Sequence, residues 1–86
     1  MSVDEVKGQL REGTDDLRSA AATIHSVRET VRSCHVAAIA VLTDSQHPHV
    51  TGAHHRLREA DREGELVLDR IKDSTGSAEE YAKALG

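Results

Sequence analysis

The sequence predicts an all-α protein, an antiparallel two-helix hairpin with a coiled-coil-like seam, in which residues 1–86 form a single domain. Apolar residues recur at alternating spacings of three and four, which is the period of a left-handed coiled coil. Pro48, the one proline, interrupts this pattern within a short polar segment and suits the first turn of a new helix. With one Tyr and no Phe or Trp, the chain has to pack through aliphatic side chains and alanine.

The first helix is expected over residues 3–44. Ser2 is placed to cap its N-terminus, and Glu5 stands three residues further on, as in a capping box. Asp4 and Glu5 also suit the positive end of the helix dipole. We expect the buried seam of this helix to consist of Val3, Val6, Leu10, Gly13, Leu17, Ala20, Ile24, Val27, Val31, Cys34, Ala38 and Val41.

A turn is expected over residues 45–47 and a second helix over residues 48–84. Residues 73–77 are poor helix formers, but the seven-residue pattern continues through them and favours an unbroken helix. Gly86 is a plausible stop signal. The expected seam of this helix is Val50, Ala53, Leu57, Ala60, Gly64, Val67, Ile71, Ser74, Ala78, Tyr81 and Leu85.

Folding the chain at this turn sets the register of the two helices. Residues whose numbers sum to about 91 should meet, because antiparallel neighbours pack side by side. This register places Val27 against Gly64 at the centre of the seam. It also brings Arg28 beside Asp61, a pairing of opposite charges that supports the same alignment.

Composition and charge argue against several classes of function. The net charge of −4 gives no electrostatic footprint for binding nucleic acid. No apolar run approaches the roughly 20 residues of a membrane span, and the N-terminus has no signal-peptide pattern. One cysteine excludes an internal disulfide. We therefore expect a cytoplasmic protein, with export that needs no cleavable signal peptide left open.

The chemistry-bearing residues are weak candidates for a site. Six histidines suggest metal binding, but no two of them have the i, i+4 spacing that places two imidazoles on one helix face. The register brings His35 near His54 or Asp61, so Cys34, His35 and His54 are candidate zinc ligands. Solvated histidines and a small seam cysteine are the simpler interpretation. We expect no cofactor and no enzymatic activity, because a two-helix hairpin has no concave pocket.

Apolar residues outside the expected seam indicate a second buried face. We expect Val36, Ile39 and Leu42 near the turn, with Leu66 and Leu68 on the second helix, to form an interface. Leu68 and Ala21 should lie on one edge of the hairpin. The partner is expected to be a second copy, giving a four-helix bundle, or another helical protein. The alternative is that these are scattered exposed apolar residues, which are common.

Four features of the chain resemble a known family. They are the start Met-Ser-Val-Asp-Glu-Val-Lys, the alanine-rich first helix, the turn at residues 45–50 and the ending Glu-Tyr-Ala-Lys-Ala-Leu. Together they resemble small actinobacterial helical hairpins that occur alone or as leader domains of polymorphic toxins, including deaminase toxins. The chain is also similar in size and shape to the W-x-G hairpin substrates of type VII (ESX) secretion. It lacks Trp-x-Gly in the turn, and Leu85 stands where the Tyr-x-x-x-Asp/Glu export signal has an acid.

Two functional hypotheses follow. The resemblance implies a non-enzymatic adaptor, trafficking or pairing module, whose partner is a toxin or a secretion component. The alternative is a small regulatory or metal-binding protein that uses the histidines around the turn. Calorimetric titration with zinc separates the two, because an interaction module predicts no specific heat of binding.

Overall fold

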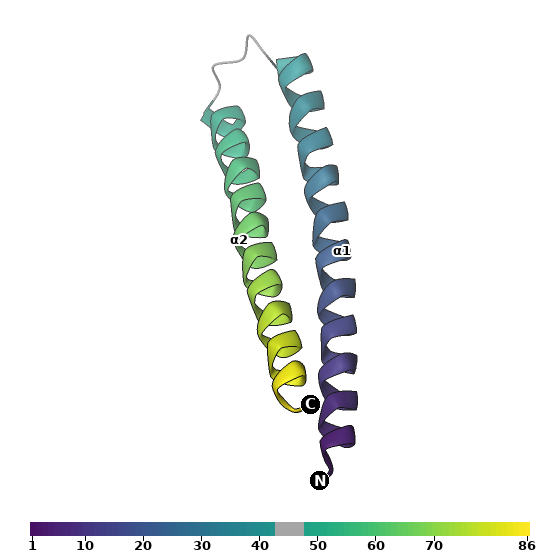
Figure 1. Cartoon of the computed structure of the whole chain (residues 1–86). Coiled ribbons are helices and arrows are strands. Elements are labelled where there is room, and N and C mark those ends of the chain that lie inside the picture. The colour runs from purple at the N-terminus through teal and green to yellow at the C-terminus, as the bar shows by residue number, and fades with distance from the viewer. Residues whose placement is uncertain (43–47) are drawn as a thin grey trace.

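The protein is an all-α hairpin of two long antiparallel helices (Figure 1). The computed structural model describes residues 1–42 and 48–86, and the side chains of all of these except residues 41 and 42. Helix α1 spans Val3–Leu42 and helix α2 spans Pro48–Ala84. The two ends of the chain lie at the same end of the hairpin. The longest dimension is 63 Å, against 16 and 15 Å across it.

The helix boundaries follow from local chemistry. The backbone N–H of Glu5 donates to Ser2 Oγ over 3.1 Å, so Ser2 caps α1 as predicted. Helix α2 begins at Pro48, continues through the weak stretch at residues 73–77 and ends next to Gly86, whose φ is +88°. Residues 43–44, where the first helix was expected to end, and the turn expected at 45–47 lie outside the described residues.

The contact face of each helix consists of two rows of residues at seven-residue spacing. One of these rows is the one expected from the sequence, and the other is a neighbouring row on the opposite side of it. Leu10, Leu17, Ile24 and Val31 are half-buried as expected, as are Leu57, Gly64 and Ile71 on α2; these form the central rows. The second row that each helix places in the contact differs from the one predicted. On α1 it consists of Thr14, Ala21, Arg28 and His35, and on α2 of His54, Asp61, Leu68, Thr75 and Ala82.

The predicted placement of Val27 and Cys34 in the seam is therefore wrong. Val27 is 56% exposed and Cys34 is exposed. The row that replaces them is one residue further along the chain and contains Arg28 and His35. These polar side chains are accommodated because each meets a polar partner on α2. Thr14, the one buried polar side chain among the described residues, satisfies its hydroxyl by donating to the carbonyl of Leu10.

Little apolar surface is removed from water by this packing. None of the hydrophobic side chains in the described part of the chain reaches the buried class. Each helix contacts a single neighbour, so every side chain keeps one open side. The hairpin by itself is consequently a marginal fold, because small cores of this kind rarely supply more than about 3–5 kcal/mol.

Candidate interaction surface

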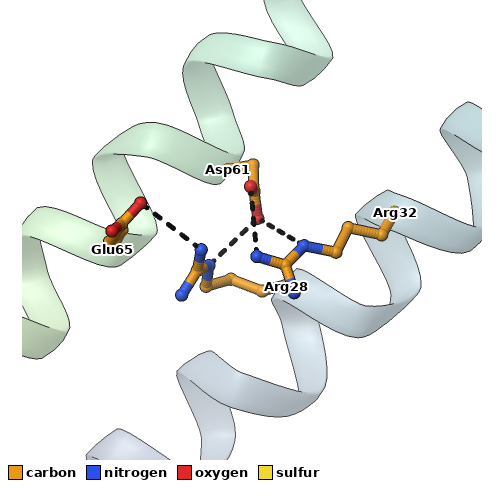
Figure 2. A network of polar contacts seen from close by, with 4 residues as sticks. All are labelled: Arg28, Arg32, Asp61 and Glu65. Atoms are coloured by element: carbon orange, nitrogen blue, oxygen red, sulfur yellow. Dashed lines mark hydrogen bonds and ion pairs between the residues drawn. The ribbon is translucent and has the colours of Figure 1, made fainter.

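A polar cluster at mid-length joins the helices across their contact (Figure 2). Arg28 Nε donates to Asp61 Oδ1 over 3.0 Å, and Arg32 Nε lies 3.3 Å from the same oxygen. A second nitrogen of Arg28 lies 3.8 Å from Glu65 Oε2. The side chains of Arg28 and Asp61 are only 13% and 27% exposed. The predicted pairing of Arg28 with Asp61 is confirmed, and with it the register of the hairpin.

The cluster shifts the pKa values of its two central groups. The hydrogen bond from Arg28 lowers the pKa of the Asp61 carboxyl below its ordinary value of 3.8; partial burial opposes this, and Arg32 adds to it. The same hydrogen bond raises the pKa of Arg28. The folded state thus favours the charged form of Asp61. The stability that this group contributes is fully present above its ordinary pKa and is lost as the pH falls through the lowered one.

Replacing Asp61 with Asn is expected to lower the melting temperature at pH 7, because Arg28 then lies half-buried without its carboxylate. The difference from wild type should shrink below about pH 4, because the Asp61 carboxyl of the unfolded chain then takes up a proton and the ionised folded state loses its advantage. Thermal melts at pH 7, 5 and 3 measure this. In an Arg28→Gln background the effect of Asp61→Asn should be much smaller. A difference that stays constant from pH 7 to pH 3 contradicts the assigned ion pair.

A pair of histidines crosses the same contact nearer the turn. His35 Nε2 and His54 Nδ1 are 2.8 Å apart, and their ring centroids are 4.9 Å apart. One of these two nitrogens donates and the other accepts, and the tautomers of the two rings decide which. The predicted approach of His35 to His54 is therefore confirmed. Within residues 1–42 and 48–86 no three His, Cys, Asp or Glu side chains come together as a metal site, and Cys34 is exposed.

The two flanks of the hairpin have different chemistry. On one flank, which we call the charged flank, Arg18 contacts Glu79, and Arg32 contacts Asp61. The positions at seven-residue spacing along this flank are Arg11, Arg18, His25 and Arg32 on α1, and Arg58, Glu65, Lys72 and Glu79 on α2. Charged side chains here are solvated and reach across to the other helix.

The opposite flank, which we call the apolar flank, carries the rows that the sequence had placed in the seam. It consists of Gly13, Ala20, Val27 and Cys34 on α1, and Ala53, Ala60, Val67, Ser74 and Tyr81 on α2. All nine are exposed, including Val67 at 40% and Tyr81 at 56%. Both rows face the same side, because Val27 and Val67 line one groove of about 220 Å³. Aliphatic side chains make up most of the lining of this groove, together with Arg28 and Asp61, and no element of the described structure covers the apolar flank.

Three of the interface residues expected from the sequence are exposed. Val36 is 67% exposed and Ile39 is 44% exposed, three residues apart on α1, and Leu66 is 51% exposed on α2. Leu68 is half-buried between the helices, where it lines a cavity together with Ala21 as predicted. The side chain of Leu42 lies outside the described residues.

The sequence did contain a signal for the apolar flank. Residues 13, 20, 27 and 34 are small or apolar at a strict seven-residue spacing, and so are most of the matching residues on α2. This signal was assigned to the contact within the hairpin, although it belongs to a surface beside that contact.

Comparison of the chain with protein-family models, with curated proteins and with solved structures finds no match. In the described ranges, neither helix combines the length and apolarity needed to cross a membrane.

Proposed function

We propose that this protein is a non-enzymatic interaction module that buries its apolar flank against another helical protein. The observation that carries the proposal is the groove between Val27 and Val67. It is lined mainly by aliphatic side chains, and it lies along a hairpin whose described hydrophobic side chains all remain at least partly exposed. Contiguous exposed apolar surface of this kind is typical of a protein-binding site.

The exposed area of the hairpin supports this proposal. The chain exposes 6655 Å². A compact monomer of its mass exposes about 5,000 Å², roughly 1,700 Å² less. A second layer of helices on the apolar flank would remove much of this excess and turn a marginal contact into a packed core. The elongated shape matches a helical partner, because a long helix can lie along the apolar flank from one end of the hairpin to the other.

The proposal extends to the pairing or trafficking role implied by the resemblance to toxin-associated hairpins. In that role the partner would be a helical toxin domain or a component of a type VII-like secretion system. The contrast between the two flanks favours a defined orientation of the partner, since charged side chains occupy one side and aliphatic ones the other.

Site-specific photo-crosslinking in cells tests the proposed function. Benzoylphenylalanine at position 27 is expected to give covalent adducts with protein, identified by mass spectrometry. Position 36 serves as the control, because Val36 is equally accessible on α1 but lies on a row away from the groove. Strong adducts at position 27 and few at position 36 support the proposal. Equal yields at both positions, or no adducts at position 27, overturn it.

A further inference from the structure

We propose that the partner is a second copy of this chain, stacked antiparallel on the apolar flank to form a four-helix bundle with the two turns at opposite ends. This inference rests on the proposed function and adds the identity and orientation of the partner. In this arrangement α1 packs against α1 of the second copy, and α2 packs against α2. The two hairpins are related by a two-fold axis perpendicular to the helices.

The exposed area of the hairpin leaves room for a stable dimer interface. A specific interface of standard size buries about 800 Å² on each partner, and homodimer interfaces are often larger and more apolar. The hairpin exposes roughly 1,700 Å² more than a compact monomer, so burying such an area on its apolar flank would bring each copy closer to the exposed area of a compact protein. A second copy has the length needed to overlap the flank along the full 63 Å.

The register of the hairpin fixes where the two-fold axis has to lie. Arg28 contacts both Asp61 and Glu65, so its level on α1 lies between those two residues on α2. Counting along both helices, Ile24 then lies level with Val67. These two residues are also close to the midpoints of Val3–Leu42 and Pro48–Ala84. An axis at this level gives complete overlap of the two copies.

Side-chain sizes on the flank are complementary about this axis. Small residues on one copy fall opposite larger ones on the other, which is the requirement for close helix packing. Ile24 and Val67 each fall opposite their own copies. On the flank and the central row beside it, Ala53 falls opposite Tyr81, and three further pairs are level to within one residue: Ala20 with Val27, Gly64 with Ile71, and Leu57 with Ala78.

The charges at the rim of the flank favour the antiparallel orientation. Glu63 and Arg70 are exposed on the outer edge of the flank on α2, and neither takes part in an ion pair within the described residues. About the axis at Val67, Glu63 of one copy lies within one residue of the level of Arg70 of the other, and the pair occurs twice. Arg56 falls opposite the neutral Ser77. A parallel stack instead sets α1 against α2 and brings no opposite charges to the same level along this rim.

Sedimentation velocity and equilibrium of the full chain test the assembly. Wild type is expected to sediment as a dimer. Val27→Asp with Val67→Asp places four carboxylates in the dimer interface and should weaken association by at least about 100-fold. Circular dichroism should still report helix, since both side chains are exposed in the hairpin. The matched control is Val36→Asp with Leu66→Asp, which adds the same charge at exposed positions away from the flank and should leave the dimer intact.

A spin label on Ala37→Cys in a Cys34→Ser background reports the orientation, because Cys34 itself lies on the flank that the dimer buries. Residue 37 is exposed and lies thirteen residues from the level of the axis, so labels on two antiparallel copies should be about 40 Å apart at 1.5 Å per residue. In a parallel stack the two labels would be level and within about 25 Å, given helix spacings of 8–10 Å. Pulsed electron paramagnetic resonance measures this distance.

Each outcome decides the proposal. A wild-type dimer with the long label distance, abolished by the flank variant only, supports it; the distance measurement stands alone if that variant fails to fold. A monomeric wild type, a dimer that survives the flank variant or dissociates in the control variant, or a short label distance overturns it. A monomer that still gives adducts with a different protein from position 27 contradicts the second copy but leaves the proposed function standing.

Discussion

Replacing Leu68 with aspartate is expected to unfold the hairpin. Leu68 is half-buried in the contact between the helices, where it lines a cavity with Ala21 and Ile71. An aspartate there loses the apolar contact with Ala21 and Ile71 and places a carboxylate in a partly buried position, next to the acidic Asp69. We expect a loss of about 2–4 kcal/mol. Because a hairpin of this size has about 3–5 kcal/mol in total, most of its helical circular dichroism signal should disappear at 37 °C.

Leu66 gives the matched control. It is only two residues away and has the same side chain, but it is 51% exposed on the far side of α2. Leu66→Asp should change the free energy of unfolding by less than about 0.5 kcal/mol. Urea melts of the two variants at equal protein concentration measure the contrast. Similar losses in both would mean that the helices do not pack along the row that contains Leu68.

The sequence predicts the elements of this fold well because their signals are local. Ser2, the acidic first turn and Pro48 each act within one turn of helix, and the observed helices begin at Val3 and Pro48 as predicted. The register was also predictable, because Arg28 and Asp61 are opposite charges that have to lie level across the contact. Length and charge pairing together leave few alternative alignments for an antiparallel hairpin.

Which rows lie between the helices could not be predicted from apolarity. The central row of α1, with Ile24 and Val31, is flanked by an apolar row on one side and a more polar row on the other. An assignment by hydrophobicity places the row of Val27 between the helices, whereas in the structure the row of Arg28 lies there. Partners at distant positions make this possible, since Arg28 meets Asp61 and His35 meets His54.

The predicted seam also determined where a second buried face was expected. That face was placed at Val36, Ile39 and Leu42 near the turn, with Leu66 and Leu68 on the second helix, because the apolar row had already been assigned to the hairpin. Because the helices use the polar row, the apolar row of each helix remains exposed. A three-row stripe on each helix is what a four-helix bundle requires, because each helix there has two neighbours.

Two glycines within α2 should respond differently to the same substitution. A Cβ built on Gly76 meets nothing within 4 Å, so Gly76→Ala should gain the helix propensity of alanine, about 1 kcal/mol. That gain corresponds to a rise in melting temperature of about 4–8 °C for a chain of this size. A Cβ on Gly64 lies 3.0 Å from Cγ and 3.1 Å from Cδ of Arg28.

Gly64→Ala should therefore gain much less than Gly76→Ala, or lose stability. The added methyl group forces the stem of Arg28 to move, and the guanidinium that it carries is the one held 3.0 Å from Asp61. Differential scanning calorimetry of both variants at one protein concentration gives the comparison. In the Arg28→Ala background the obstacle is absent, so Gly64→Ala should recover the stabilisation seen at position 76. Equal gains at both positions in the wild-type background would show that Arg28 moves without cost and that its contact with Asp61 contributes little to the stability of the hairpin.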